Sequence, residues 1–170
     1  REYPYRDLVE TNRGRSRLEL EYELLDTGVF ADDRYFDVVV EYAKAGPEDV
    51  LVRITAHNRG PDAATLHLLP TLWFRNTWSW KGGGSKPVIE AIGGTASSVV
   101  RAHHTDPLFQ ESLEDYYLYT EAKAPWLFTD NETNHARLFG SPNAGPFVKD
   151  GINDLLIHGR TGAVNPALTG

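Results

Sequence analysis

The chain has 170 residues, of which 41% are hydrophobic and 24% are charged, proportions typical of a globular domain that buries a core. The formal net charge of -7 disfavours nucleic acid or an anionic membrane surface as partner and suits a neutral ligand such as a sugar. Without Cys, disulfides, thiolate catalysis and Cys-ligated zinc are excluded. The sequence has neither a membrane-spanning apolar run nor a signal peptide, so we expect a cytoplasmic location.

The ends of the sequence suggest a fragment. Met is absent, and the last residues, Asn165 to Gly170, are turn-forming rather than part of a capping element. We therefore expect a piece of a longer protein, with N-terminal processing as the alternative.

The first elements are expected to be extended. Residues 1–17 are polar and mixed in charge, which favours an extended arm over a sheet. Residues 18–25 alternate Leu or Tyr with Glu, the period of a half-buried strand, although Glu and Leu also favour a helix.

Three runs rich in apolar residues follow, at 35–42, 50–57 and 64–74. The second places its apolar side chains on one face, and Leu51 alone departs from the alternation. Short turns separate the runs, so we expect antiparallel neighbours. Pro70 lies inside the third run, which predicts an edge or a bulge there.

Shorter elements complete the chain. Residues 81–85 are Gly-rich and predict a mobile loop, 130–134 a polar turn and 141–146 a loop. Residues 152–158 suit one or two helical turns capped by Asp150. Further strands are expected at 88–92, 97–103, 116–120 and 126–129. Many short strands between Gly and Pro turns predict an all-β antiparallel sandwich, taken as a single domain over 1–170 or a fragment of one.

One segment concentrates side chains suited to sugars. Residues 71–80 read Thr-Leu-Trp-Phe-Arg-Asn-Thr-Trp-Ser-Trp and hold three of the four Trp. Flat aromatic rings stack on the apolar C–H faces of sugars, and Arg and Asn hydrogen-bond hydroxyl groups. The candidate substrate-binding residues are Trp73, Arg75, Asn76, Trp78 and Trp80. The alternative is that these aromatic residues belong to the core or pack against a partner domain.

Several separated stretches carry a resemblance to a known family. They include His57 to Pro70, Leu127 to Asn134 and Val164 to Gly170, together with Leu8 to Arg13 and Glu21 to Gly28. With residues 71–80, they resemble the large bacterial members of the mannosyl-oligosaccharide glucosidase group, glycoside hydrolase family sixty-three.

The resemblance implies an N-terminal β super-sandwich of the galactose-mutarotase-like type, complete or incomplete, packed on a C-terminal (α/α)6 barrel. In such enzymes the barrel holds the two catalytic carboxylates and inverts the anomeric configuration. This chain would be the sandwich, so its partners would be the catalytic domain of the same polypeptide and an oligosaccharide. No catalytic residue, metal ligand or cofactor is expected here.

Other polar groups suggest weaker hypotheses. His103 and His104 with Asp106 could form a metal site or relay, but adjacent residues of a strand point to opposite faces. Residues 130–134 alternate oxygen ligands without the rest of a calcium loop. The alternative functions are a carbohydrate-binding module that uses the Trp residues and an aldose-epimerase-like enzyme, which requires a His and a carboxylate to converge.

Overall fold

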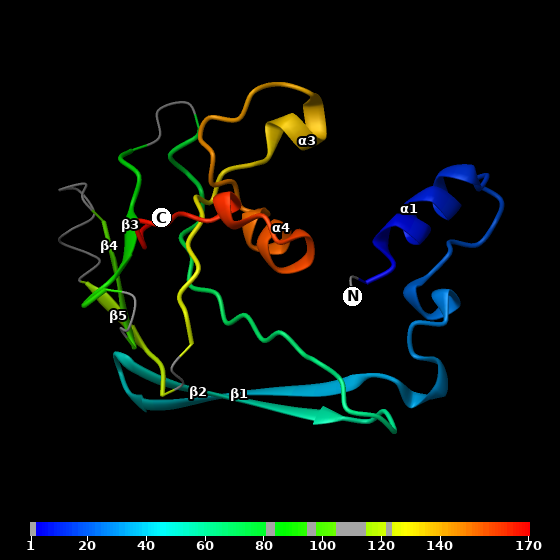
Figure 1. Cartoon of the computed structure of the whole chain (residues 1–170), viewed down its shortest axis with the longest axis horizontal. Coiled ribbons are helices and arrows are strands. Elements are labelled where there is room, and N and C mark those ends of the chain that lie inside the picture. Colours follow the sequence, from blue (N-terminus) through cyan, green and yellow to red (C-terminus); the bar gives the residue numbers. More distant parts are fainter. Residues whose placement is uncertain (1–2, 81–83, 95–97, 105–114, 122–123) are drawn as a thin grey trace. The chain divides into compact units, whose positions relative to one another are not determined.

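The computed structural model describes residues 3–80, 84–94, 98–104, 115–121 and 124–170, which form two compact units, one up to Leu69 and one from Pro70 onward. The first contains α1 (Tyr5–Gly14), the 3-10 helices η1 (Leu24–Thr27) and η2 (Ala31–Asp33), and strands β1 (Phe36–Gly46) and β2 (Asp49–Asn58). The second contains β3 (Val88–Ala91), β4 (Val99–His103), β5 (Tyr116–Tyr119), α3 (His135–Phe139), α4 (Gly151–His158) and η3 (Thr161–Ala163) (Figure 1).

The first unit begins with a helix, so the extended arm expected over residues 1–17 is wrong. The helix α1 has Asp7 in its first turn and Arg13 in its last, and both charges suit the helix dipole. Tyr5, Leu8 and Asn12 recur at helical spacing. The Asn12 amide both donates to the Tyr22 carbonyl at 2.9 Å and accepts from the Tyr22 N–H at 2.8 Å.

The strand expected over residues 18–25 is also wrong. Asn12 occupies the backbone groups of Tyr22 that a strand would offer to a neighbour. The Asp26 carboxylate accepts from the Glu23 N–H at 2.8 Å, at the start of η1. Leu18 and Leu20 are 99% and 88% exposed, so their alternation with Glu marks no buried face.

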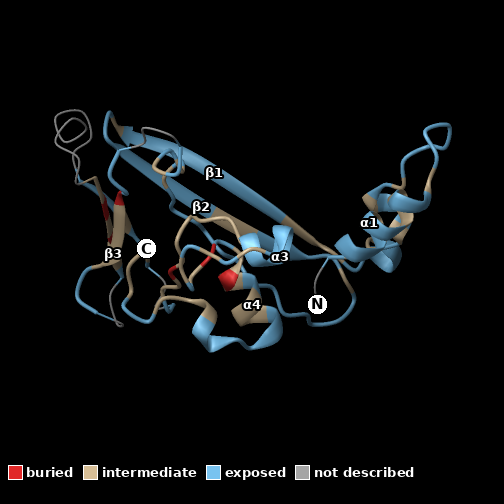
Figure 2. Ribbon diagram, turned by 90° about the horizontal axis from the view of Figure 1, so that it is seen from above, coloured by how far each residue is buried: buried red, intermediate tan, exposed pale blue. Residues whose placement is uncertain are grey.

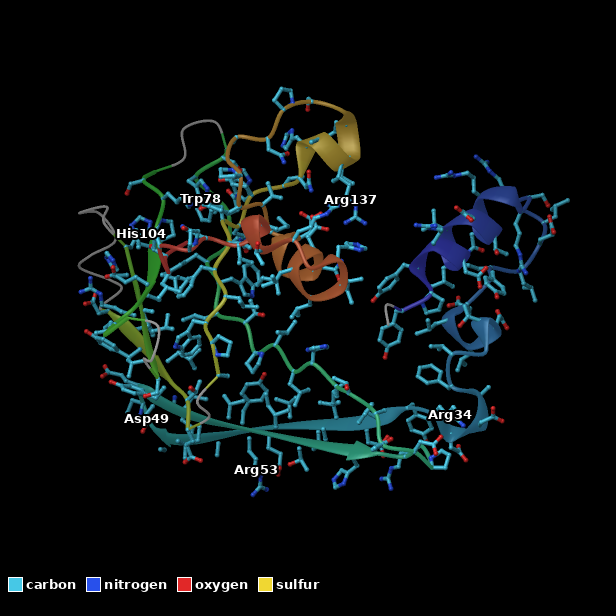
Figure 3. The ribbon with its side chains drawn as sticks, in the orientation of Figure 1. Arg34, Asp49, Arg53, Trp78, His104 and Arg137 are labelled. Carbon is cyan, nitrogen blue, oxygen red and sulfur yellow. The ribbon has the colours of Figure 1, made fainter. Side chains whose placement is uncertain are left out.

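Strands β1 and β2 form an antiparallel hairpin, which confirms the strands expected at 35–42 and 50–57. The register pairs Val38 with Ala56, Val40 with Ile54 and Tyr42 with Val52. These residues share one face because side chains alternate along a strand. The opposite face holds the Glu41–Arg53 ion pair, with contacts of 2.8 and 3.0 Å (Arg53 is labelled in Figure 3).

Residues 64–74 were expected to form a third strand, but they belong to neither sheet. Their composition suits a pleated, half-buried surface, and such a preference gives a strand only where a neighbour offers a free edge. Pro70 also removes one of the ladder donors.

The second unit contains a three-stranded antiparallel sheet in the order β3-β4-β5. These three strands confirm those expected at 88–92, 97–103 and 116–120, although Ser97 lies outside the described residues. Thr169 extends the sheet by a bridge to Glu90, with backbone hydrogen bonds between Ile89 and Gly170 of 2.8 and 2.9 Å.

The buried hydrophobic side chains that the structure describes all lie in this second unit (Figure 2). Val100 and Ala102, on one face of β4, are each 2% exposed, and Phe128 and Val148 are each 6% exposed.

The pairing of the strands confirms the expected antiparallel sheets. The fold is mixed rather than all-β, because helices occur in both units.

The strand expected over 126–129 is wrong, although this segment is well bonded. Phe128 accepts from the Asn165 N–H at 2.8 Å, and the Asp130 N–H donates to Phe147 at 2.6 Å. Its partners are single residues of separate segments, not a continuous strand.

The helix expected over 152–158 is confirmed as α4. Asp150 lies at its N-cap, but its side chain makes no cap hydrogen bond. The carboxylate accepts from Asn134 and Arg137 instead. The loop at 141–146 is confirmed, while Lys81, Gly82 and Gly83 of the Gly-rich segment lie outside the described residues.

Replacing Gly151 tests the packing of α4. A Cβ at this buried position would lie 2.1 Å from the Ala163 carbonyl oxygen. We expect Gly151→Ala to lower the free energy of unfolding by about 1–3 kcal/mol, because the backbone must shift. Urea denaturation followed by circular dichroism measures this. Gly162→Ala is the control, since nothing lies within 4 Å of its Cβ; equal losses in both variants would contradict the packing.

Candidate functional site

The tryptophan-rich segment, residues 73–80, is anchored to residues 131–132 by hydrogen bonds. The Trp78 indole N–H donates to Glu132 Oε1 at 2.6 Å (Trp78 is labelled in Figure 3). The Asn76 amide donates to the Asn131 carbonyl at 2.7 Å and to Glu132 Oε2 at 3.3 Å. In return, the Asn131 amide donates to the Phe74 carbonyl at 2.7 Å. We call these contacts the 76–132 clamp.

The 76–132 clamp occupies the side-chain donors of Asn76 and Trp78, two of the predicted sugar-binding residues. The side chains of Asn76 and Trp78 are half-buried, and the donors that a hydroxyl group would need face Glu132 and Asn131. Ser79 N–H donates to the Asn76 side-chain oxygen at 3.2 Å, so both ends of that amide are used. These two residues therefore fix the shape of the segment.

Trp73, Arg75 and Trp80 lie at its exposed positions. Trp73 is 63% exposed and Trp80 is 56% exposed. The Arg75 guanidinium lies 5.2 Å from the centre of a Trp80 ring, which is the geometry of a cation–π contact. An exposed ring beside a charged donor can stack on a sugar and hydrogen-bond its hydroxyl groups.

The sequence pattern located the Trp residues but not Glu132, which accepts hydrogen bonds from Trp78 and Asn76. Residues 130–134 were interpreted as a polar turn, and they lie in bend and irregular backbone. Asn131 is also the acceptor residue of a formal glycosylation sequon, and its amide is committed to Phe74. A carboxylate so far along the chain from Trp78 gives no local signal.

The second unit also brings a His and a carboxylate together, as an epimerase-like mechanism requires. His103 Nε2 lies 3.5 Å from Glu90 Oε1, on neighbouring strands β4 and β3. Arg101 shares the same Glu90 oxygen, and this hydrogen bond raises the pKa of Arg101 above its ordinary value. Asp106 lies outside the described residues. Within the described ranges, no group of three or more potential metal-ligating side chains forms.

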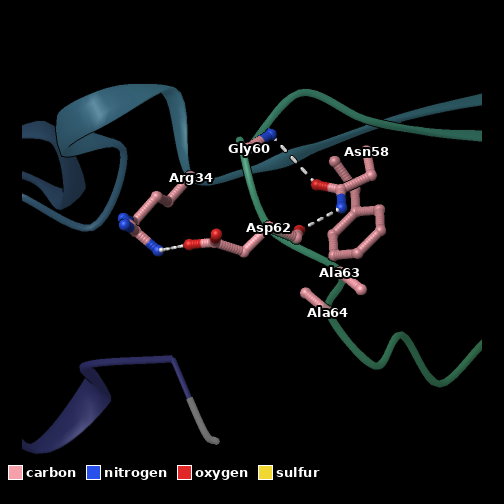
Figure 4. Close-up of a pocket in the computed structure, with 7 residues that line it drawn as sticks. Arg34, Asn58, Gly60, Asp62, Ala63 and Ala64 are labelled. Carbon is pink, nitrogen blue, oxygen red and sulfur yellow. Dashed lines mark hydrogen bonds and ion pairs between the residues drawn. The ribbon is translucent and has the colours of Figure 1, made fainter.

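A small pocket of about 100 Å³ lies in the first unit, where β1 begins and β2 ends (Figure 4). Arg34 and Asp62 form an ion pair of 3.0 Å at its edge. The Asn58 side-chain amide donates to the Asp62 carbonyl at 2.8 Å and accepts from the Gly60 N–H at 3.0 Å. Drug-sized ligands usually occupy roughly 300–1,000 Å³. We therefore interpret this pocket as part of the turn that follows β2.

No helix in the described part of the chain has the length and apolar character needed to cross a membrane.

Trp78→Phe tests the clamp. The substitution keeps an aromatic ring but removes the N–H that Glu132 accepts, so a half-buried carboxylate loses a partner. We expect the free energy of unfolding to fall by about 1–3 kcal/mol. Trp73→Phe, at an exposed position, should change it by less than about 0.5 kcal/mol. Urea denaturation checks both variants, and comparable losses would mean that the hydrogen bond to Glu132 does not stabilise the segment.

Comparison with known proteins gives one long relative and no named activity. No protein-family model matches the chain, and no solved structure matches it. The chain is similar to the uncharacterized protein YMR196W of Saccharomyces cerevisiae, with 33% identity over 190 residues that include 96% of this chain. The match covers 18% of the yeast protein, so the chain spans about a fifth of that relative's length.

Proposed function

We propose that this chain is a non-catalytic N-terminal β-sandwich domain of a glucosidase-like glycoside hydrolase of the family sixty-three type. Its role is to brace a catalytic (α/α)6 barrel in the same polypeptide or to line the substrate cleft of that barrel. The resemblance of several separated stretches suggests the enzyme class. The observation that carries the accessory role is an exposed apolar face on the hairpin β1–β2.

The hairpin has two chemically different faces. We define the apolar hairpin face as Val38, Val40, Tyr42, Val50, Val52 and Ile54, which the strand register places together. Its Val and Tyr side chains are 44–74% exposed. The other face holds the Glu41–Arg53 ion pair and Asp37, which pairs with Arg59 at 2.6 Å. That face also exposes Val39 and Leu51, but its charged groups favour contact with water, so the first face has the stronger tendency to leave water.

Burial of the apolar hairpin face against another protein surface would be favourable in free energy. Fully burying an exposed Val side chain is worth about 1.5–3 kcal/mol, and the Val residues of this face are about half-exposed, so a cover would gain part of that amount at each position. A two-stranded hairpin is at best marginally stable in water without such packing. Contiguous exposed apolar patches on soluble proteins mark interaction sites.

The rest of the first unit is also without buried residues over its described positions. Each of its described residues keeps at least intermediate exposure, and Leu18 and Leu20 are almost fully exposed. A unit without buried side chains needs a partner surface to gain hydrophobic stabilisation. The yeast relative continues far beyond the matched region, and we infer that such additional chain supplies the partner.

The proposed substrate of the whole enzyme is a neutral oligosaccharide, cleaved by an inverting α-glucosidase-type reaction. The catalytic carboxylates lie outside this chain in the proposal, so the chain contributes shape and contacts rather than proton transfer. We keep the cytoplasm as the proposed compartment and propose no cofactor.

A second candidate function is a carbohydrate-binding module. The exposed rings of Trp73 and Trp80, with Arg75 against Trp80, favour it. The proximity of His103 to Glu90 is the observation that would support an aldose-epimerase-like activity. These two side chains lie on the surface of a sheet, however, whereas such an enzyme needs a concave pocket.

Two neighbouring valines of β1 test the accessory role. Val40 is 44% exposed on the apolar hairpin face, and Val39 is 47% exposed on the opposite face. In the full-length polypeptide that carries this chain, we expect Val40→Thr to lower the free energy of unfolding by about 1–3 kcal/mol, because a hydroxyl group becomes buried. In the isolated chain the same change should cost less than about 0.5 kcal/mol.

Val39→Thr is the matched control, since it makes the same chemical change at similar exposure. We expect it to be nearly neutral in both the full-length polypeptide and the isolated chain. Equal effects of the two substitutions in the full-length polypeptide would show that the apolar hairpin face is not covered. Denaturant unfolding of all four proteins provides the comparison.

Hydrolysis assays test the enzyme class. We expect the full-length polypeptide to hydrolyse α-glucosides or α-mannosides with inversion of the anomeric configuration, and the isolated chain to be inactive. Activity of the isolated chain would contradict the non-catalytic role. Failure of the full-length polypeptide on all of these substrates would contradict the glucosidase assignment but not the docking of the hairpin.

A further inference from the structure

The sheet β3-β4-β5 has a second face that the buried core does not use. Val100 and Ala102 point to the core side of β4, so their neighbours in the strand point to the other side. The register pairs Arg101 with Glu90 on one neighbour and with Tyr117 on the other. We call the residues on this side the outer sheet face: Val88, Glu90, Val99, Arg101, His103, Tyr117 and Tyr119.

Two tyrosines give this face an aromatic surface. Tyr117 is 47% exposed and Tyr119 is 70% exposed. Their ring centres are 6.3 Å apart and their planes differ by 30°, so the two rings present neighbouring and roughly aligned flat surfaces. Their positions two residues apart in β5 keep them on one side of the sheet.

A charged network fixes the polar groups beside these rings. Arg101 Nε lies 3.1 Å from Glu90 Oε1, and Arg101 Nη1 lies 3.4 Å from Asp115 Oδ2. The Tyr117 hydroxyl group lies 3.5 Å from the same Asp115 oxygen, and His103 approaches Glu90. The guanidinium and carboxylates are thus held in place before any ligand arrives, which lowers the cost of ordering them.

We propose that the outer sheet face is a binding site for a neutral oligosaccharide, stacked on Tyr117 and Tyr119. The tyrosine rings offer apolar surfaces to the C–H faces of sugar rings. Arg101 has five N–H donors, so it retains some beyond those that face Glu90 and Asp115, and the two carboxylates offer further acceptors to hydroxyl groups.

The charge on this face selects a neutral ligand over an acidic one. Arg101 carries one positive charge, and Glu90 and Asp115 carry one negative charge each, so these three side chains together have a net negative charge. An acidic sugar would be repelled by the carboxylates, and the positive charge is already paired. A polyol without charge meets no such penalty.

The outer sheet face shares no residue with the apolar hairpin face or with the tryptophan-rich segment, so a sugar site here is distinct from the accessory role. Loss of sugar binding would leave the docking of the hairpin untouched, and failure of the docking test would leave this site untouched.

Strand β5 provides matched variants for a test. Tyr117 and Tyr119 lie on the outer sheet face, whereas Tyr116, which is 55% exposed, pairs with Ala102 and points to the opposite side. The chain is titrated with maltohexaose, cellohexaose and mannohexaose by isothermal calorimetry, with an oligogalacturonate as the acidic probe. Thermal unfolding of each variant confirms that it remains folded.

We expect at least one neutral hexasaccharide to bind saturably and the oligogalacturonate not to bind. Tyr117→Ala and Tyr119→Ala should each weaken binding by about tenfold or more, while Tyr116→Ala should change it by less than about twofold. Tyr119→Phe keeps the ring and should retain most of the binding. Equal weakening by Tyr116→Ala would overturn the assignment to this face. So would the absence of binding by all three neutral sugars at about 10 mM, which would indicate a polypeptide as the partner.

Discussion

The unequal chemistry of the two faces of hairpin β1–β2 is the constraint on which the first unit depends. Two strands can satisfy each other's backbone, but they cannot bury their own apolar side chains. Val38, Val40 and Tyr42 therefore keep 44–74% of their surface exposed on one side, while Glu41 and Arg53 pair on the other. The hairpin accordingly alternates as a sheet with one apolar face does, and Figure 2 colours most of its length as exposed.

The second unit buries apolar side chains of its sheet against other residues of the same unit. Its sheet buries Val100 and Ala102, with Phe128 and Val148 also buried in this unit. The 76–132 clamp ties Phe74, Asn76 and Trp78 to Asn131 and Glu132. Because the core uses one side of the sheet, the outer side is available for polar and aromatic residues, and the register of β3, β4 and β5 assembles them into one surface.

Sequence patterns correctly predicted the segments that pair with a neighbouring strand. They wrongly predicted strands at segments of similar composition that have no such neighbour. The β-branched run in β1 and the alternation in β2 were sufficient to predict both strands. The alternation also predicted that Val50, Val52, Ile54 and Ala56 share one face. Residues 64–74 and 126–129 have similar composition, yet no adjacent strand pairs with them along their length. The contact between Trp78 and Glu132 spans 54 residues of sequence, so no local pattern could predict it.

Hydrogen–deuterium exchange tests directly whether the apolar hairpin face is an interior surface of a larger protein. Amides of β1 and β2 should exchange quickly in the isolated chain and become strongly protected in the full-length polypeptide, because a covered hairpin opens only with its partner. Amides of β4, beside the buried Val100, should be protected in both. Equally fast exchange of the hairpin in both proteins would contradict the account.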